Sequence, residues 1–502
     1  MRDTVCSDGE HGRTMKPSAE SAGAITQFFS SQGYTEEALS GLGLAELPWS
    51  ALATLSVSGW SFEGEPVLDL LIRMFYLGDA VALDTAEKFI PQNVLQALLE
   101  LRLLQRDGER LQGVCTLTRL GELLLAFDSR QRFRAHAEDL VLGVNPTTRV
   151  LINCSMARPG GRVLDLGTGC GTLAIAAASK AGTVIGTDAN WRALEFSRIN
   201  AALNGVSNVA FVLGDRFEPV AGHRFDSIVC NPPFFLAPTS GLLYSENNIE
   251  LDGFVESLAR SAPAYLEEGG VFQMLCEWAE RDSEPWNARL RPWFENCQCD
   301  VHIWWGYRFS TPEYARKRAV EQGQLARESA GSSFVHRISY LNVRRVKAIC
   351  GGLITLRRRS GENWFWVEEM QKQPAGPIGE ALRERFSTRD ILESKHEEEL
   401  LRARPRLAPQ VHLVSESVHR DGAWSTERSY LERTGDLPAK LVLDALLSKL
   451  AAHFDGSDTL EGLLKQVATE RNVPMDRVIP EGLRVTRVLA TTGLILLKLG
   501  DS

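Results

Sequence analysis

Apolar residues spaced three and four apart dominate the first part of the chain and predict helices there. One such run covers residues 66–75, and Pro91 opens a second. Residues 103–112 follow, with an Asp-Gly dipeptide between β-compatible flanks that is typical of a hairpin. Helices followed by a hairpin predict a winged-helix-like domain over residues 23–134. Because none of its helices is strongly basic, we expect it to serve docking or dimerisation rather than DNA binding.

Short β-branched runs alternate with helical runs between residues 135 and 359. This alternation predicts βαβ units and a mostly parallel sheet. Seven strands are expected, at residues 163–166, 183–187, 209–212, 225–230, 270–275, 300–305 and 352–357. The central domain is therefore expected to be of the α/β class.

The pattern after residue 359 is mixed and predicts an α+β domain over residues 360–502. Its expected elements are a strand or packed edge at 364–366, a linker at 371–377, a helix at 441–450, a turn with a helix cap at 454–460 and an apolar stretch at 483–499. The turn contains Asp-Gly-x-x-Thr-Leu and is similar to a turn of small winged-helix docking modules. A winged-helix-like unit is thus expected near the end of the chain.

Length and composition place the chain among globular proteins of about three domains, with 502 residues of which 44% are hydrophobic. Residues 1–22 lack the apolar core of a signal peptide and are expected to be a disordered polar tail. No apolar run approaches 18 residues, so we expect no membrane span and a cytoplasmic protein. The nine cysteines are scattered, which favours buried thiols. Cys297 and Cys299 near His302 lack a second metal-binding half, so no metal is expected.

The net charge of −9 argues against a protein that coats nucleic acid. Residues 311–360 depart from this balance, with eleven basic residues against three acidic ones. The simpler interpretation of this basic segment is a solvated helix face with a charged strand end. A patch for RNA or DNA is the alternative.

A glycine-rich loop follows the first expected strand and precedes an alanine-rich helix; it consists of Gly167, Thr168, Gly169, Cys170 and Gly171. Glycines let the backbone approach a ligand closely, and the start of a helix offers free N–H groups. A dinucleotide fingerprint reads GxGxxG, whereas this loop reads GxGxG with Asp165 two residues before it. An acid there would repel a pyrophosphate and suits a cationic ligand such as a sulfonium amino acid.

Two further acids stand at expected strand ends. Asp188 ends the second strand, where a carboxylate can accept both hydroxyls of a ribose. Asp215 follows the third strand and can accept the amino group of an adenine. Since open sheets bind ligands at the carboxyl ends of their strands, these acids and the loop predict binding of S-adenosylmethionine (SAM).

The fourth expected strand ends in the tetrad Asn231-Pro232-Pro233-Phe234. The prolines donate no N–H, so the Asn231 side-chain oxygen and the Pro232 carbonyl can both act as acceptors. Two acceptors aimed at one NH2 group would orient its nitrogen, and Phe234 offers a stacking face for a planar substrate. The tetrad therefore predicts methyl transfer to a planar amide or amino nitrogen, with catalysis by proximity and orientation.

Five segments together resemble the HemK family of protein-glutamine N-methyltransferases, namely residues 165–171, 186–188, 200–205, 214–219 and 224–234. The resemblance covers roughly residues 140–275. It implies SAM contacts along residues 165–171, at Asp188, at Asp215 and at Arg216, with Asn231 shared between cofactor and substrate. It also implies a Rossmann-like, seven-stranded class I methyltransferase sheet in the order 3-2-1-4-5-7-6, and a protein or peptide substrate.

The chain departs from the HemK pattern in three places. Phe234 stands where the family usually has Tyr, and Phe is seen more in rRNA guanine and adenine N-methyltransferases. Residues 144–149 only loosely match the family's Pro-Arg-Pro-x-Thr-Glu segment and lack its acid. Domains at both ends are also not standard for a release-factor methyltransferase.

Three acceptors therefore stay open at this stage. The first is a protein glutamine side chain. The second is an exocyclic amine of guanine or adenine in RNA or DNA, which Phe234 and the basic segment favour. The third is a small-molecule or peptide product. The intact tetrad argues against a SAM-sensing module without catalysis.

Overall fold

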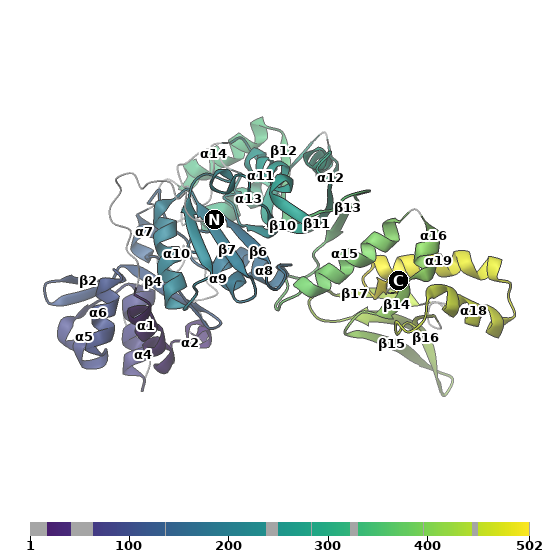
Figure 1. The fold of residues 1–502 in the computed structure, drawn as a ribbon, viewed down its shortest axis with the longest axis horizontal. Coiled ribbons are helices and arrows are strands. Elements are labelled where there is room, and N and C mark those ends of the chain that lie inside the picture. Colours follow the sequence, from purple (N-terminus) through teal and green to yellow (C-terminus); the bar gives the residue numbers. More distant parts are fainter. Residues whose placement is uncertain are drawn as a thin grey trace. The chain divides into compact units, whose positions relative to one another are not determined.

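A computed structural model describes residues 18–41, 64–135, 137–236, 249–282, 284–321, 330–394, 396–443 and 450–500 (Figure 1). The chain divides into two compact units. The first holds residues up to 152 and from 157 to 368, and the second holds residues 153–156 and 369–502. Among the described residues, no helix is both long and apolar enough to span a membrane.

The first helix, α1 (Ala19–Ser31), begins earlier than the sequence indicated. The Ser18 side chain accepts a hydrogen bond from the Ser21 N–H and caps the helix. Ala22, Ile25 and Phe29 form its buried face. The expectation of a disordered tail over residues 1–22 is therefore wrong for its last four residues, because they already belong to an amphipathic helix; residues 1–17 lie outside the described ranges.

The next elements are α2 (Glu36–Gly41), α4 (Pro66–Leu71), the π-helical η1 (Ile72–Leu77), β1 (Ala80–Ala82), α5 (Leu83–Phe89), α6 (Gln92–Glu100), β2 (Leu104–Asp107) and β3 (Arg110–Gly113). The three strands form an antiparallel sheet in the order β1-β3-β2. Gly108 has φ +57°, which is why the β2–β3 turn needs a glycine. From α4 onward the elements follow the order of a winged helix.

A second hairpin, β4 (Cys115–Leu120) and β5 (Leu123–Asp128), leads through the short α7 (Arg130–Arg134) into the central domain. Asn200 lies in α10 (Trp191–Leu203) and Asn204 is the C-cap of this helix. Both side chains bind the backbone of β5. Asn200 donates to the Ala126 carbonyl and accepts from its N–H, and Asn204 does the same at Leu124. Side-chain amides thus extend the hairpin's free edge and join it to the central domain.

One eight-stranded sheet forms the middle of the first unit, built from β6 (Arg162–Leu166), β7 (Thr183–Asp188), β8 (Val209–Leu213), β9 (Phe225–Cys230), β10 (Leu266–Arg281), β11 (Cys299–Ser310), β12 (Val346–Arg358) and β13 (Phe365–Glu369). Its order is β13-β11-β12-β10-β9-β6-β7-β8. β6 to β10 run parallel, whereas β12 is antiparallel to both β10 and β11. Counted along the chain, the first seven strands lie in the order 3-2-1-4-5-7-6.

The eighth strand moves the domain boundary. β13 pairs with the β11 edge of this sheet, so residues 360–368 belong to the first unit. The expected boundary at residue 360 therefore falls nine residues too early. The Trp364-Phe365-Trp366 run accounts for the shift, because its buried tryptophans pack against the sheet.

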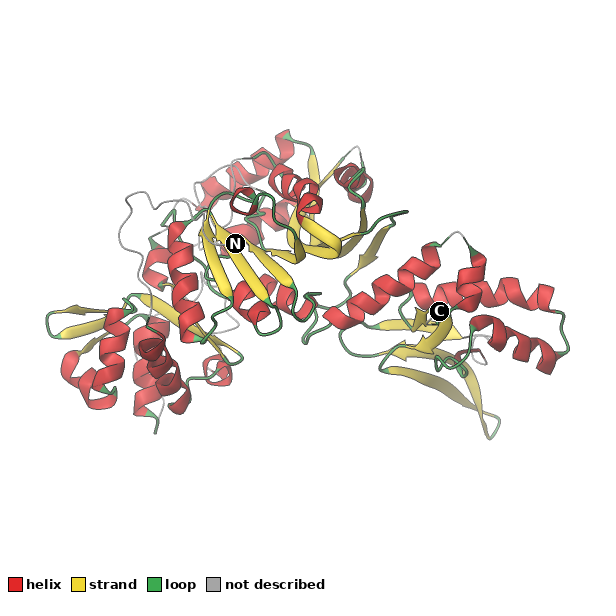
Figure 2. Ribbon diagram, viewed as in Figure 1, coloured by secondary structure: helices red, strands yellow, loops and turns green. Residues whose placement is uncertain are grey.

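Helices cover both faces of the sheet (Figure 2). On β6, Val163 packs with α9 (Thr172–Ala178), while the next residue, Leu164, shares a core with α11 (Gly253–Ser261). Successive side chains of a strand point to opposite faces, so these two helices lie on opposite sides. The remaining elements are α8 (Pro146–Cys154), α12 (Trp286–Leu290), α13 (Thr311–Glu321), α14 (Ala330–Val343) and the 3-10 turns η2 (Glu218–Val220), η3 (Ala262–Tyr265) and η4 (Arg291–Phe294).

The second unit combines helices with two small sheets. Its elements are α15 (Gly379–Glu393), α16 (Glu397–Arg402), β14 (Arg404–Leu407), β15 (Val411–Arg420), β16 (Ala423–Arg433), β17 (Ala439–Leu443), α18 (Leu460–Arg471), α19 (Met475–Thr491) and β18 (Ile495–Lys498). β14 pairs with β18, and β16 lies between β15 and β17. Thr459 caps α18, which agrees with the turn and cap expected at residues 454–460.

The helix expected at residues 441–450 is wrong at its start. Residues up to Leu443 form β17, which pairs with β16 from Ala439 to Leu443. Their burial alternates with a period of two, as in a strand with one covered face. Residues 444–449 lie outside the described ranges.

Candidate active site

A pocket of about 350 Å³ lies at the carboxyl ends of β6 to β9. Leu166, Asp188 and Cys230 bring three strand ends to its wall, and Asp215 follows the fourth. This is the edge at which open α/β sheets bind their ligands. The strand order therefore gathers segments that are far apart in the sequence around one cavity.

The glycine-rich loop after β6 forms one wall of this pocket. Gly167, Gly169 and Gly171 have φ of +75°, +55° and +84°, a region that other residues seldom adopt. A Cβ atom at Gly167 or Gly169 would meet no atom within 4 Å, whereas one at Gly171 would lie 3.0 Å from Ser197. Backbone conformation demands the first two glycines, and close packing against α10 adds to the demand for the third. Thr168 and Cys170 line the pocket, but Gly171 does not.

Asp165 stands behind the loop and is fully buried. Its Oδ2 accepts hydrogen bonds from Thr168 Oγ1 at 2.7 Å and from the Ala174 N–H at 3.0 Å. Burial raises the pKa of this carboxyl to about 7. Asp165 is not among the residues that line the pocket. We assign it the bracing of the loop in place of the direct cofactor contact expected from the sequence.

Asp188 lies at the end of β7 and lines the pocket. Its Oδ2 accepts from the Gly169 N–H and its Oδ1 from the Asn190 N–H, both at 2.8 Å. Burial raises the pKa of this carboxyl. Each oxygen of a carboxylate has a second lone pair. Asp188 can thus hold the glycine-rich loop and still accept hydroxyl groups from a ligand.

Asp215 and Arg216 line the pocket after β8. Arg216 has φ +47°, and its Nε lies 3.0 Å from Asp215 Oδ2. The two side chains are about half exposed and pair with each other. Their expected contacts with SAM remain predictions.

The tetrad after β9 divides between the pocket and the core. Asn231, Pro232 and Pro233 line the pocket. Phe234 is 9% exposed, packs edge-to-face on Phe235 at 5.4 Å between ring centroids and does not line the pocket. The expected stacking of Phe234 on a substrate is therefore not supported, because its ring is taken up by the core.

The Asn231 carboxamide has one satisfied end and one free end. Its Nδ2 donates to Thr147 Oγ1 at 3.1 Å. Its Oδ1 is buried and has no hydrogen-bond partner among the described residues. A buried acceptor without a partner costs free energy, which indicates that a ligand donor belongs there.

Several residues of the pocket carried no prediction from the sequence. Leu140 to Gly143, Asn145, Thr148, Asn190, Phe254 and Leu258 line it. Asn145 and Thr148 lie in the segment whose likeness to the HemK motif is loose, and that likeness was the only available signal. The apolar residues of α11 show no motif, because their position depends on how the helix packs.

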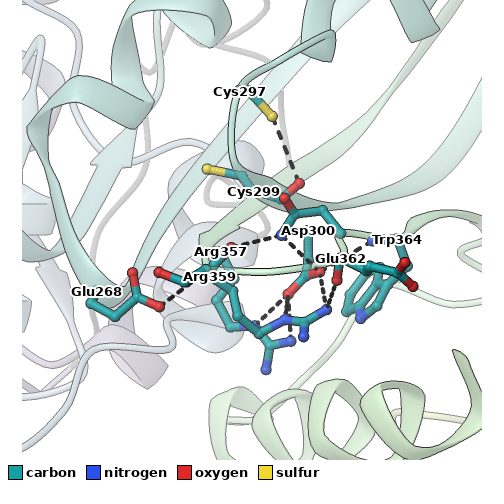
Figure 3. Close-up of polar contacts among 10 residues, drawn as sticks. Glu268, Cys297, Cys299, Asp300, Arg357, Arg359, Glu362 and Trp364 are labelled. Atoms are coloured by element: carbon teal, nitrogen blue, oxygen red, sulfur yellow. Dashed lines mark hydrogen bonds and ion pairs between the residues drawn. The ribbon is translucent and has the colours of Figure 1, made fainter. Parts of the chain in front are cut away.

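Several cations of the basic segment are paired with carboxylates in the part of the chain that the structure describes. Figure 3 shows Arg357 and Arg359 pointing at Asp300, which accepts hydrogen bonds from both guanidinium groups. Elsewhere Arg318 pairs with the buried Glu277, and Arg344 pairs with Glu250. These ion pairs occupy cations that an RNA or DNA partner would need. Arg327 lies outside the described residues.

The cysteines near this cluster do not build a metal centre. Cys297 Sγ lies 3.7 Å from the Cys299 carbonyl oxygen, and His302 Nε2 lies 3.1 Å from Glu368 Oε1 (Figure 3 shows the two cysteines). Within the described ranges, no group of three or more His, Cys, Asp or Glu residues could hold a metal ion.

The mostly parallel sheet, the glycine-rich loop after its first strand and the acids and Asn-Pro-Pro at the next strand ends define the class I methyltransferase fold. Residues 142–300 match the family model of the methyltransferase small domain. This part of the chain is therefore a class I methyltransferase domain, and its resemblance to HemK is confirmed. SAM is the cofactor of such domains.

Curated relatives agree with this assignment. The chain is 35% identical over 132 residues to the release factor glutamine methyltransferase of Xylella fastidiosa (strain 9a5c), which covers 23% of this chain and 47% of the relative. It is 32% identical over 154 residues to the protein of that name from Buchnera aphidicola, covering 27% and 54%. It is 33% identical over 185 residues to the ribosomal protein L11 methyltransferase of Pelotomaculum thermopropionicum, covering 33% and 58%. The chain thus spans about half the length of these relatives.

Proposed function

We propose that the protein is a SAM-dependent N-methyltransferase that acts on a planar amide nitrogen, that of a glutamine side chain in a protein. The buried Oδ1 of Asn231, which has no partner among the described residues, carries this proposal. It belongs to a side chain that lines the pocket, next to two prolines that cannot donate. Such a wall suits a ligand group that is rich in N–H donors.

Other residues of the pocket fit the cofactor SAM. The glycine-rich loop leaves open space where side chains would stand, and the Asp188 carboxylate faces the cavity. Asp188 would hold the ribose hydroxyls, and the residues after β8 would lie beside the adenine. When bound, the cofactor supplies an electrophilic methyl group on a sulfonium.

The chain's own contribution is orientation of the acceptor. Asn231 Oδ1 and the Pro232 carbonyl would accept the two N–H groups of an amide, which fixes the plane of its nitrogen. Alignment of two reactants can lower the activation free energy by about 7 to 11 kcal/mol. A nitrogen that gains a fourth bond becomes acidic, so it can lose its proton without a strong base.

Three observations favour a protein glutamine over a nucleic-acid base. Phe234 is packed in the core and offers no stacking face for a base. Arg318, Arg357 and Arg359 are held by carboxylates, which weakens the case for a phosphate-binding surface. The relatives quoted above are named as methyltransferases of release factors and of a ribosomal protein, which also favours a protein substrate.

The proposal predicts separate effects on binding and catalysis when Asn231 is changed to Ala. SAM affinity, measured by calorimetry, should stay within a few-fold of wild type, because Asp188 and the loop are intact. Methyl transfer should fall by about a hundredfold or more, because the acceptor loses its orientation. The assay is incubation with methyl-labelled SAM and a cell lysate, followed by fractionation into protein, RNA and small molecules.

The same assay identifies the acceptor. Label at a glutamine side chain of a protein supports the proposal. Label in RNA or in small molecules would show that the acceptor is not a protein glutamine. An Asn231→Ala variant with full activity would refute the role of the tetrad.

A further inference from the structure

The orientation of the Asn231 carboxamide decides whether its oxygen or its NH2 group meets the acceptor. We propose that Thr147 is a positioning residue that fixes this orientation, as the middle of a hydrogen-bonded chain from Asn145 to Asn231. The inference rests on the proposed function and adds a residue that no motif assigned. Thr147 is not among the residues lining the pocket, so it acts through Asn231.

A backbone N–H fixes which atoms donate and which accept in this series of hydrogen bonds. Asn145 precedes Pro146, the first residue of α8, and its Oδ1 accepts from the Thr148 N–H at 2.8 Å. A backbone N–H can only donate, so the Asn145 atom must be the amide oxygen. This is the geometry of an asparagine N-cap.

The same oxygen also lies close to two hydroxyls. Thr147 Oγ1 lies 2.6 Å from Asn145 Oδ1, and Thr148 Oγ1 lies 2.9 Å from it. A carbonyl oxygen has no proton and two lone pairs, of which the Thr148 N–H takes one; the Thr147 hydroxyl makes the shorter of the two other contacts and donates to the second lone pair. The single proton of Thr147 is thereby committed, and only its lone pairs face Asn231.

The group of Asn231 that approaches Thr147 must then be a donor. Nδ2 meets this requirement at 3.1 Å, which leaves Oδ1 as the end of the carboxamide without a partner among the described residues, in a side chain that lines the pocket. A carboxamide turned by 180° would place Oδ1 against the Thr147 lone pairs and present NH2 to the NH2 of the acceptor. Both ends of the turned amide would lose their hydrogen bonds. The hydrogen bonds from Asn145 through Thr147 therefore favour the orientation in which Asn231 Oδ1 can accept from the substrate.

Changing Thr147 to Val tests this inference, since valine keeps the shape of the side chain and removes the hydroxyl. We expect kcat for methyl transfer to fall about ten- to hundredfold, as for other small misplacements of a reacting group. The dissociation constant of SAM, measured by calorimetry, should stay within twofold. Thr147→Ser retains the hydroxyl and should restore kcat to within a few-fold of wild type.

The outcomes are distinguishable from failure of the proposed function. A wild-type protein that transfers no methyl group would refute the proposed function and, with it, this inference. An active wild type with a Thr147→Val variant of equal kcat would refute the positioning role alone. So would a Thr147→Ser variant as impaired as Thr147→Val. Should Thr147→Val fail to fold in a thermal melt, Thr147→Ala removes the same hydroxyl with less bulk and is measured in its place.

Discussion

Asp188 has one observed and one proposed task at the residue scale: its oxygens accept from the Gly169 and Asn190 N–H groups, and its place in the pocket lining supports the proposed contact with the ribose. Asp188→Ala should weaken SAM binding by about a hundredfold or more, because charge-assisted hydrogen bonds contribute about 1.5 to 3 kcal/mol each. Titration calorimetry measures the loss.

A matched control separates an effect at the pocket from the general loss of a carboxylate that accepts a backbone N–H. Asp226 also accepts a backbone N–H, that of Arg162 at 2.8 Å, but it lies at the amino end of β9, on the edge of the sheet away from the pocket. Asp226→Ala should leave SAM affinity unchanged. Equal affinities for the Asp188 and Asp226 variants would contradict the assignment of Asp188 to the ribose.

Residue types and spacing were enough to locate the pocket but not to aim each side chain. Asp188 and Asn231 were predicted from their places at strand ends, and both line the cavity. Asp165 and Phe234 were predicted in the same way, yet one braces the loop from behind and the other enters the core. Direction depends on the strand's pleat and on packing partners from distant segments, which spacing alone does not contain.

At the element scale, Asn200 joins the β4–β5 hairpin to the methyltransferase domain. It is fully buried, exchanges two hydrogen bonds with Ala126 and donates a third to the Cys170 carbonyl of the glycine-rich loop. Asn200→Ala would leave buried backbone groups without these partners, at about 1 to 3 kcal/mol each. We expect a loss of roughly 3 kcal/mol or more, seen as a lower melting temperature and urea midpoint.

The exposed Asn287 offers the comparison for this test. Its side chain bonds only its neighbour's N–H, Ala288, at the surface of α12 among the contacts described. Asn287→Ala should change the melting temperature little. Similar melting temperatures for both variants would show that the amide bridge between hairpin and helix contributes little to stability.

The elements themselves were predictable where one pattern dominated. The strands β6 to β9 and the cap of α18 agree with their sequence signals. The prediction of a helix from residue 441 is wrong because a short apolar segment fits a helix and a strand equally well. Only the pairing of β17 with β16 decides between them. The strand predicted at residues 364–366 is placed in the C-terminal domain for a similar reason, because only the free edge of β11 shows that β13 belongs to the central sheet.

At the scale of the whole molecule, the distribution of charge helps to distinguish a protein substrate from a nucleic-acid substrate. The chain carries −9 overall, and part of the basic segment that could offset this is paired, with Arg357 and Arg359 on Asp300 and Arg318 on Glu277. Protein–phosphate contacts release counterions, so six to ten of them lower affinity by about 10³ to 10⁵ between 50 and 200 mM salt. We therefore expect the KM for the acceptor to change by less than about threefold over that range.

The salt titration uses the acceptor fraction that the labelling assay identifies, with the KM for SAM measured in parallel at each salt concentration. The charged residues that line the proposed SAM pocket are Asp188, Asp215 and Arg216 rather than a field of surface cations, so the KM for SAM should be similarly flat. A steep rise in the acceptor KM with a flat SAM KM would point to a phosphate backbone at the acceptor side. The paired arginines would then have to exchange Asp300 and Glu277 for phosphate, which Asp300→Asn would make easier by releasing Arg357 and Arg359. A shallow slope in both the wild type and this variant would exclude that exchange and support an acceptor without a phosphate backbone, such as the proposed glutamine amide.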